Sequence, residues 1–421
     1  MNVLWITNTI LSSAAKRLNI QNTSGTWMES ALENMKFQKS VKLSIASLAP
    51  VTTVNRFEDD GATFYCIPRC KKKIYQYNSS KCIKDWKYVI NDSKPDIIMV
   101  WGTEYAHGLC AMKIAHGIPT VIVIQGILTS IQKYYLGGLS NRELKHALSL
   151  RNIMKRDSIR QKQKGFEKRN ETERTMLQLA GNIIVENQWA KANCKTIAGN
   201  CTFYEFRQGI NRLFFDLKWD YDQCVKNSIF CTAPVNYPLK GFHQIIKALA
   251  IVRKRYKDAV LRVPGMNNPF TCGFKEQLKQ DGYIKYLKDL IRELDLQDSI
   301  VFLGRLDSKR IGEELMRANV FVVPSSIENI STSLREAMVV GTPAVASFVG
   351  GIPESIQDTF NGRLYRFEEY AQLADQIMEL FANKDLSLRF SNNSRKTMRD
   401  YLSEKSDAAT LTEIYKGILK K

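Results

Sequence analysis

Two glutamates eight positions apart, Glu328 and Glu336, flank a run of hydroxyl-bearing residues that includes Ser331 and Thr332. Serine and threonine favour the N-cap position, and the first turn of a helix offers unpaired N–H groups and a partial positive charge that can bind an anion. Carboxylates do not bind phosphate, but they accept hydrogen bonds from hydroxyl groups. An anion site with a carboxylate on each side therefore predicts a ligand whose phosphate lies between two sugars, as in a nucleotide sugar.

The surrounding residues predict where this cluster lies in a sheet. The apolar run 320–323 is typical of a buried strand, a helix is expected to follow until Gly341, and a second strand is expected at 344–347. Glu328 then lies on a strand-to-helix loop and Glu336 about one turn into the helix. Both carboxylates border the carboxyl edge of a parallel sheet, where ligands of open α/β sheets bind.

Lys240 and Gly241 occupy a similar junction earlier in the same half of the chain. They follow a predicted strand at 228–232 and precede a helix with one apolar face. A lysine at this place can put its charge over a diphosphate and stabilise it as a leaving group. A surface-loop lysine is the alternative, which the nearby glutamate pair makes less attractive.

The second half of the chain resembles the retaining family-4 glycosyltransferases of the GT-B fold. The motifs that carry this resemblance are the glutamate pair, Gly341-Thr342-Pro343, Gly350-Gly351-Ile352-Pro353-Glu354 and Asn361-Gly362. The resemblance implies that Glu328 contacts the hydroxyls of the transferred sugar and that Glu336 contacts the ribose hydroxyls. We therefore expect Glu328 to be catalytic together with Lys240, and the turn at Ser331 and Thr332 to belong to the nucleotide-sugar site.

The sequence departs from the family pattern at two places. The family commonly has an arginine five or six residues before this lysine, where this chain has Val235 and Pro234. Either another cation, for which Arg305 is the candidate, binds the donor diphosphate, or its charge is neutralised less fully. Many relatives have a His-Gly pair after the fourth strand, where this chain has Gln125-Gly126. A glutamine can hydrogen-bond a sugar but cannot act as a base at neutral pH.

Further candidates lie in the first half of the chain. Gly25 matches the glycine turn that follows the first strand in the family and lets the backbone approach a donor phosphate or an acceptor. Glu104 and His107 follow a predicted strand at 96–101. We expect Glu104 and Gln125 to bind the acceptor and His107 to be catalytic, with a structural or capping histidine as the alternative.

Length and pattern predict two domains. The 421 residues suit two α/β domains that each bury a core, and strands that alternate with helices favour doubly wound parallel sheets. The resemblance implies GT-B: two Rossmann-like domains facing a cleft, with residues 1–206 binding the acceptor and residues 207–401 binding the nucleotide sugar. An amphipathic helix at about 402–421 is expected to cross back to the first domain. Strands are predicted near residues 3–7, 41–47, 96–101, 120–125, 182–186, 228–232, 259–263, 300–303, 320–323 and 343–347.

The net charge of +19 is concentrated in the first half, where residues 1–206 hold 29 Lys/Arg against 16 Asp/Glu. Much of it lies in residues 69–88 and 142–174, the first of which also contains aromatic residues. Such segments suit an anionic membrane surface or a lipid-linked acceptor, although solvated helix faces remain the alternative. Nucleic acid is disfavoured because no nucleic-acid-binding motif accompanies the charge.

The sequence predicts a cytoplasmic protein, peripheral at the inner face of the membrane. It shows no apolar run long enough to span a membrane and no secretory signal, and its nine cysteines lack paired spacing. We therefore expect reduced thiols, no metal site and no cofactor, with a nucleotide-diphosphate sugar as donor substrate.

The predicted activity is metal-independent transfer of a sugar to a glycan or lipid-linked acceptor, with retention at the anomeric carbon, in polysaccharide or glycolipid assembly. Two alternatives stay open: a nucleotide-sugar epimerase of GT-B architecture, and a non-catalytic module that binds anionic lipid or nucleic acid. A dinucleotide dehydrogenase is disfavoured because no GxGxxG motif follows the first strand.

Overall fold

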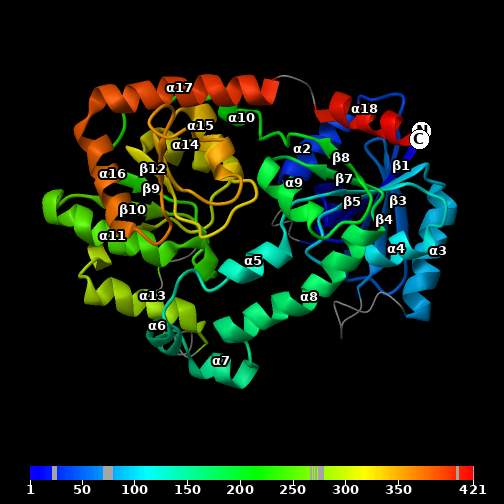
Figure 1. The fold of residues 1–421 in the computed structure, drawn as a ribbon, viewed down its shortest axis with the longest axis horizontal. Coiled ribbons are helices and arrows are strands. Elements are labelled where there is room, and N and C mark those ends of the chain that lie inside the picture. The colour runs from blue at the N-terminus through cyan, green and yellow to red at the C-terminus, as the bar shows by residue number, and fades with distance from the viewer. Residues whose placement is uncertain are drawn as a thin grey trace. The chain divides into compact units, whose positions relative to one another are not determined.

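The computed structural model describes residues 1–20, 26–69, 79–265, 268, 270, 273, 279–403 and 407–420. The chain forms two compact α/β units (Figure 1). The first unit contains residues 1–130, 166–211 and 402–421, and the second contains residues 131–165 and 212–401.

The first unit is built on an eight-stranded sheet in the order β3-β4-β2-β1-β5-β6-β7-β8, in which every neighbouring pair is parallel except β3 and β4. Its strands are β1 (Asn2–Thr7), β2 (Lys42–Ala49), β3 (Asn55–Asp59), β4 (Ala62–Pro68), β5 (Ile97–Trp101), β6 (Thr120–Val123), β7 (Asn182–Val185) and β8 (Thr202–Glu205). Its helices are α1 (Ser12–Arg17), α2 (Thr26–Met35), α3 (Ser80–Ser93), α4 (Leu109–Ile114), α9 (Gln188–Lys195) and α18 (Asp407–Leu419), with parts of α5 (Leu128–Tyr134) and α8 (Ile159–Leu179).

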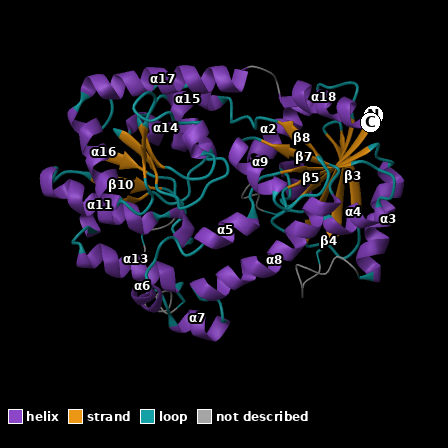
Figure 2. Ribbon diagram, viewed as in Figure 1, coloured by secondary structure: helices purple, strands orange, loops and turns teal. Residues whose placement is uncertain are grey.

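Helices cover both faces of this sheet (Figure 2). Successive side chains of a strand point to opposite faces, so Val3 and Trp5 pack with α2 and α18, whereas Leu4 and Ile6 pack with α3, α4, α8 and α9. A parallel sheet buried on both faces requires strands that are apolar throughout, as β5 and β6 are. The predicted doubly wound architecture is therefore confirmed for this unit.

The C-terminal helix packs on the first unit, as predicted. Leu411 and Tyr415 of α18 are fully buried, and the Trp5 indole N–H donates to the Tyr415 hydroxyl at 2.9 Å. Leu419, which the sequence placed on the same apolar face, is instead 43% exposed at the end of the helix.

A β-hairpin that the sequence prediction omitted forms the edge of the first sheet. β3 and β4 are antiparallel and joined by Asp60 and Gly61, with φ values of 52° and 78°. An Asp-Gly pair with positive φ at both positions is typical of a two-residue hairpin turn. The sheet is therefore mixed and not wholly parallel.

The second unit is built on a six-stranded parallel sheet in the order β11-β10-β9-β12-β13-β14. Its strands are β9 (Ser228–Phe230), β10 (Val260–Val263), β11 (Ile300–Phe302), β12 (Val320–Val323), β13 (Ala344–Ser347) and β14 (Arg363–Tyr365). Its helices are α6 (Asn141–His146), α7 (Leu150–Lys155), α10 (Leu213–Asp216), α11 (Phe242–Arg255), α13 (Gly282–Glu293), α14 (Ser308–Arg317), α15 (Thr332–Val340), α16 (Tyr370–Ala382) and most of α17 (Lys384–Ser403), with 3₁₀ turns η1 (Pro238–Lys240), η2 (Gln297–Ser299) and η3 (Ile352–Glu354).

Residues 131–165, which the sequence assigned to the first domain, pack with the second unit. The His243 imidazole contacts the Gly137 carbonyl at 2.9 Å, and Lys247 forms a 2.8 Å ion pair with Glu143. These contacts join α6 and the turn before it to α11. The two compact units therefore differ from the predicted domains, residues 1–206 and 207–401.

Candidate functional site

Two of the predicted donor residues, Lys240 and Glu328, lie on loops that follow the central strands of the second sheet. From β9 the chain builds outward through β10 and β11, and it then returns to form β12 on the other side of β9. Neighbouring strands whose connections leave in opposite directions create a crevice at their carboxyl ends, where ligands of open α/β sheets bind. The loop after β9 carries Lys240 and the loop after β12 carries Glu328.

Lys240 and Glu328 meet at this crevice. The Lys240 ammonium lies 2.6 Å from a Glu328 carboxylate oxygen, which also accepts a hydrogen bond from the Ser325 hydroxyl at 2.7 Å. Both side chains are largely buried, with 28% of Lys240 and 11% of Glu328 exposed. A cation and an anion that are partly removed from water, yet still accessible, can exchange partners with a charged ligand.

A cavity of about 50 Å³ lies between the two loops and the first turn of α15. Its described lining residues are Thr232, Ala233, Pro234, Lys240, Val322, Val323, Pro324, Ser325, Glu328, Ser331 and Ser333. Lys240 is the only cation among these lining residues. The cavity therefore combines one positive charge, one carboxylate, several hydroxyls and a helix N-terminus.

Two glycines allow the loops that carry Lys240 and Glu328 to pack closely against neighbouring backbone. At Gly241, with φ 70°, a Cβ atom would lie 1.6 Å from the Pro324 carbonyl oxygen. At Gly350, with φ 52°, a Cβ atom would lie 1.8 Å from the Glu328 carbonyl oxygen. Any other residue would clash with the backbone and adopt an unfavourable conformation. Ser326 adds a third constraint, because its N–H donates to the Leu239 carbonyl at 2.7 Å.

The first turn of α15 has the predicted cap. The Ser331 hydroxyl accepts the Leu334 N–H at 3.4 Å, and Thr332 is the first residue of the helix. Ser331 lines the cavity, whereas Thr332 is not among the lining residues. The helix ends at Gly341, which has φ 92°, as the sequence predicted.

Glu336 lies one turn further along α15 and is half-buried. No described residue donates a hydrogen bond to its carboxyl group, and burial raises its pKa to about 8. A carboxyl group that lacks donors in the ligand-free protein can accept hydrogen bonds from a ligand. Glu336 does not line the cavity that contains Lys240.

Arg305, the predicted second cation, is not brought to this cavity. It is an exposed residue that follows β11, an edge strand separated from β9 by β10. Arg305 does not line the cavity that contains Lys240, so its role as the second cation stays a prediction.

In the first unit, the structure brings Glu104 and Gln125 together above Gly102. A Cβ atom at Gly102 would lie 2.0 Å from a Glu104 carboxyl oxygen and 3.0 Å from the Gln125 side-chain oxygen. Burial raises the pKa of Glu104 to about 7, and the nearby Glu173 adds to this rise, while backbone N–H groups and Arg169 oppose it. These two predicted acceptor residues therefore form one polar cluster.

His107 lies beside this cluster but faces the backbone. Its ring nitrogens lie 3.1 Å from the Tyr105 carbonyl and 3.0 Å from the Trp101 carbonyl, and only 3% of the residue is exposed. Burial lowers its pKa to about 4. A neutral imidazole whose nitrogens both face carbonyl groups is not directed at a substrate, which favours the structural alternative. Gly25 lies outside the described residues.

The sequence prediction missed Glu173, a buried carboxylate in the same unit as Glu104 and Gln125. Its two oxygens accept hydrogen bonds from the Thr103 hydroxyl at 2.9 Å, the Leu128 N–H at 2.8 Å, and the Thr129 N–H and hydroxyl at 2.9 and 2.6 Å. Glu173 thus caps the first turn of α5 from α8. No local sequence signal marks it, because its donors lie at least 44 positions away.

The described part of the chain contains no group of three or more His, Cys, Asp or Glu side chains placed to hold a metal ion. None of its helices is long and apolar enough to cross a membrane.

Comparison with known proteins assigns most of the second unit to a family. Residues 218–397 match the family described as Glycosyl transferases group 1. N-acetyl-alpha-D-glucosaminyl L-malate synthase of Bacillus anthracis is 28% identical over 131 residues, which are 31% of this chain and 34% of that protein. D-inositol 3-phosphate glycosyltransferase of Corynebacterium urealyticum is 26% identical over 180 residues, 43% of this chain and 41% of that protein. The matches thus span less than half the length of these curated relatives.

Solved structures show the same fold over the whole chain. Sucrose-phosphate synthase from Thermosynechococcus elongatus aligns with a TM-score of 0.72 at 16% identity, over 100% of this chain and 99% of that one. Anabaena Alr3699/HepE in complex with UDP and glucose aligns with a TM-score of 0.67 at 15% identity, over 99% of this chain and 100% of that one. At these identities the likeness establishes the fold.

Proposed function

We propose that this chain, whose residues 218–397 match the group 1 glycosyltransferases and which has the GT-B fold, transfers a sugar from a nucleotide-diphosphate sugar to a glycan or lipid-linked acceptor. The observation that carries the proposal is the junction of Lys240, Glu328 and the α15 N-terminus around one cavity at the switch point of the second sheet. This arrangement offers positive charge for phosphate and a carboxylate for sugar hydroxyls within one small volume.

Lys240 and the first turn of α15 receive the diphosphate in this proposal. The lysine charge and the N-terminal helix dipole stabilise the negative charge that develops as the glycosidic bond breaks. In this proposal, donor binding exchanges the 2.6 Å ion pair between Lys240 and Glu328 for two new interactions. The diphosphate takes the ammonium group, and the hydroxyls of the transferred sugar donate to Glu328.

Glu336 binds the ribose hydroxyls. Two adjacent hydroxyls supply the donors that its carboxyl group lacks in the ligand-free protein, and donors to a carboxylate lower its pKa. The UDP and glucose in the Anabaena structure make uridine nucleotides the first donors to test.

We further propose that the reaction retains configuration and needs no metal. The bond between the anomeric carbon and the diphosphate oxygen breaks, and a bond to the acceptor oxygen forms on the same face of the sugar. The acceptor hydroxyl gives its proton to the departing diphosphate, so no protein base is required. The position of Lys240 supports the metal-independent part of the proposal, because its ammonium group can neutralise phosphate charge.

On the acceptor side, the proposal assigns Glu104 and Gln125 to hydrogen bonds with acceptor hydroxyls. An acceptor in polysaccharide or glycolipid assembly, met at the cytoplasmic face of an anionic membrane, accounts for the basic residues of the chain.

The first test measures release of the sugar from UDP-, GDP- and ADP-sugars and its transfer to an acceptor, with EDTA present or absent. NMR then assigns the anomeric configuration of the product. We expect activity with at least one donor, unaffected by EDTA, a retained anomer, and large losses in Lys240→Met and Glu328→Gln. A product with inverted anomeric configuration would contradict the proposed retention, and loss of activity in EDTA would contradict metal independence. Epimerisation of the donor without acceptor would instead establish the epimerase alternative.

A further inference from the structure

α7 is an amphipathic helix whose polar side faces the protein. Asn152 is 1% exposed, and its side-chain oxygen accepts the Gly282 N–H at 2.7 Å. Its neighbour Arg151 pairs with Asp281, the N-cap of α13, at 3.2 Å. These bonds fix the orientation of α7 on the second unit, because a buried amide and an ion pair are costly to break.

The apolar side of α7 faces solvent. Leu150, Ile153 and Met154 are 69%, 58% and 85% exposed, and their spacing places them on one side of the helix. Apolar side chains gain free energy when they leave water, so an apolar face held outward by buried polar bonds indicates a binding surface. We refer to these three side chains as the α7 apolar face.

The segment around this face is strongly cationic. Residues 141–164, all of which the structure describes, contain eight Lys/Arg and two Asp/Glu. Both acidic side chains are engaged, Glu143 with Lys247 at 2.8 Å and Asp157 with Arg151 at 3.0 Å. The exposed cations are Arg142, Lys145, Lys155, Arg156, Arg160 and Lys164.

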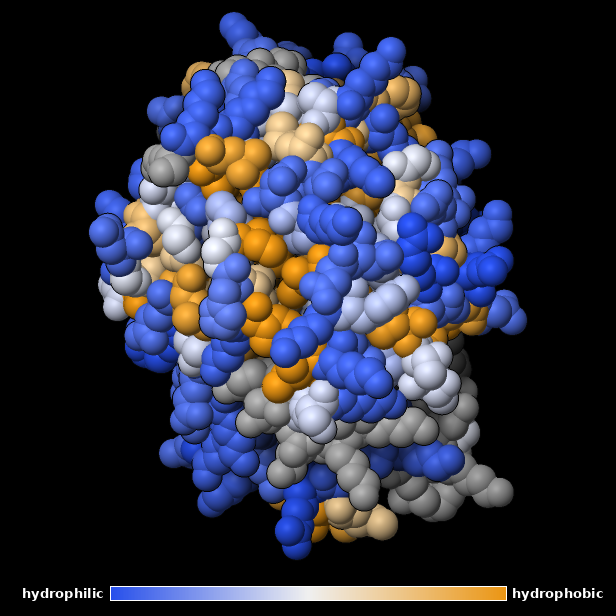
Figure 3. Space-filling model, turned by 90° about the vertical axis from the view of Figure 1, so that its right-hand side faces the viewer, coloured by the Kyte–Doolittle hydropathy of each residue, from blue (hydrophilic) through white to orange (hydrophobic). Residues whose placement is uncertain are grey.

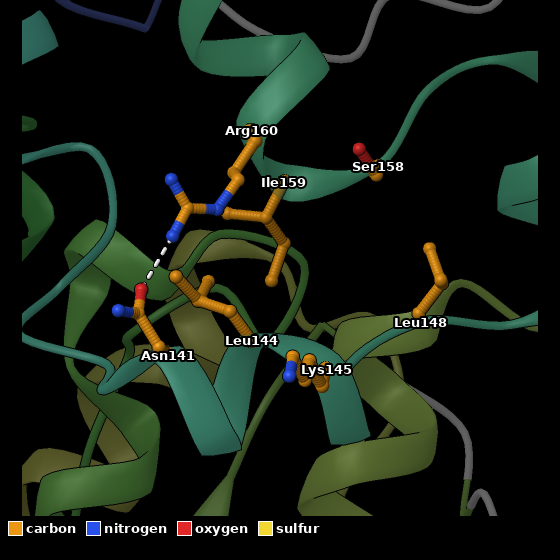
Figure 4. A pocket seen from close by; sticks show the side chains of 7 residues that line it. All are labelled: Asn141, Leu144, Lys145, Leu148, Ser158, Ile159 and Arg160. Atoms are coloured by element: carbon orange, nitrogen blue, oxygen red, sulfur yellow. Dashed lines mark hydrogen bonds between the residues drawn. The ribbon is translucent and has the colours of Figure 1, made fainter.

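An apolar groove adjoins the same segment between α6 and the start of α8 (Figure 4). It has a volume of about 390 Å³ and is lined by Leu144, Leu148 and Ile159 together with polar and cationic side chains. Arg160 reaches across it and donates to the Asn141 side-chain oxygen at 2.5 Å. The groove thus presents hydrocarbon next to positive charge, which matches a lipid acyl chain and an anionic headgroup.

Exposed apolar areas alone are common on this protein, and Figure 3 shows several between hydrophilic side chains on another face. The α7 apolar face differs because exposed cations lie in the same segment and because Asn152, on the other side of the helix, is buried. A second copy of the chain is disfavoured as its partner, since a twofold interface would bring two surfaces of like charge together.

We propose that α6, α7 and the start of α8 form a docking surface for an anionic phospholipid membrane, with the α7 apolar face inserted among the lipids and the exposed cations on the headgroups. This inference deepens the membrane association proposed above and locates it on the second unit, whereas the charge distribution of the sequence suggested the first domain. It is independent of the identity of the donor sugar.

The test is co-sedimentation of the full chain with vesicles of phosphatidylcholine alone or with about 30 mol% phosphatidylglycerol, without donor or acceptor. We expect binding to the anionic vesicles only, weakened at about 0.5 M salt. Removing three cations in Lys145→Gln/Lys155→Gln/Lys164→Gln should weaken binding about 100-fold, since each contributes about fivefold, or about 1 kcal/mol. The matched control Lys254→Gln/Lys257→Gln/Lys309→Gln removes three exposed cations elsewhere and should weaken it far less.

The apolar contribution has its own matched pair. Met154→Ser should weaken binding about tenfold, whereas Phe37→Ser, at a position 82% exposed in the first unit, should leave it unchanged. Transfer to a soluble acceptor should stay unchanged in both, which separates loss of docking from loss of catalysis. The proposal would be overturned if the chain did not bind anionic vesicles. It would also be overturned if the triple lysine variants, or Met154→Ser and Phe37→Ser, weakened vesicle binding equally. A dimer in solution that Met154→Ser converts to a monomer, or polyglutamate binding as tight as vesicle binding, would overturn it as well.

Discussion

Replacement of Glu336 by glutamine should make the ligand-free protein more stable and, at the same time, weaken donor binding. Burial raises the pKa of this carboxyl group from 4.5 to about 8, and no described residue donates to it. At alkaline pH the folded protein therefore holds a poorly solvated negative charge that glutamine lacks. Glutamine also loses the charge with which Glu336 would accept ribose hydroxyls, so stability and function change in opposite directions.

The size and pH range of the effect follow from proton linkage. Between pH 4.5 and about pH 8 the folded state binds the Glu336 proton more tightly than the unfolded chain does, so the free energy of unfolding falls as pH rises. The pKa gap of about 3.5 units sets an upper limit of about 5 kcal/mol above pH 8 and about 3 kcal/mol at pH 7. Below pH 4.5 the carboxyl group is protonated in both states and the cost disappears.

The assay is thermal unfolding of the wild type and Glu336→Gln at about pH 5 and about pH 8.5. If half of the upper limit is realised, the Tm of the variant should exceed that of the wild type by about 5–10 °C at the higher pH and by much less at the lower one. Glu313→Gln, which alters an exposed carboxylate on α14, serves as the control and should change Tm little at either pH. A Tm difference for Glu336→Gln that is the same at both pH values would refute the reasoning.

Three further substitutions test the parts around the site. Lys240→Met should lower kcat/KM about 100- to 1000-fold, measured with saturating acceptor, because it removes the one cation among the described residues that line the cavity; an unchanged kcat/KM would contradict this role. Gly350→Ala should cost about 1–3 kcal/mol and displace Glu328, since its Cβ would lie 1.8 Å from a backbone oxygen. Gly265→Ala, at φ 91° with no atom of a described residue within 4 Å of its Cβ, controls for backbone strain alone, and equal Tm losses would exclude the clash. Glu173→Gln should destabilise the first unit by about 3 kcal/mol, because its amide group must face a hydrogen-bond donor; unchanged hydrogen exchange in α5 would contradict this.

Local signals explain what could be predicted from the sequence. The strands near 320–323 and 344–347, the Ser331 cap and the stop at Gly341 each depend on neighbouring residues, and each is present in the structure. The apolar periodicity of the C-terminal helix was equally local. The hairpin at Asp60-Gly61 was also visible as a turn signal, although the sequence prediction did not use it.

Contacts between distant segments explain what could not be predicted. The approach of Gly241 to Pro324 and the donors of Glu173 depend on which loops the fold brings together. Residues 131–165 include the short helices α6 and α7 and parts of α5 and α8, and the place of this segment is set by bonds to α11 and α13 that its own sequence does not reveal. His107 follows a strand as predicted, but only the structure shows that its ring contacts two carbonyl groups.

The central claim is that the cavity between Lys240, Glu328 and the first turn of α15 holds the donor diphosphate. Isothermal titration with UDP, GDP and ADP, each compared with its nucleoside, tests this most directly in the wild type and in Lys240→Met. We expect at least one nucleoside diphosphate to bind the wild type far more tightly than its nucleoside, and Lys240→Met to remove most of that difference. A diphosphate preference that survives the loss of Lys240 would show that the donor phosphates bind elsewhere.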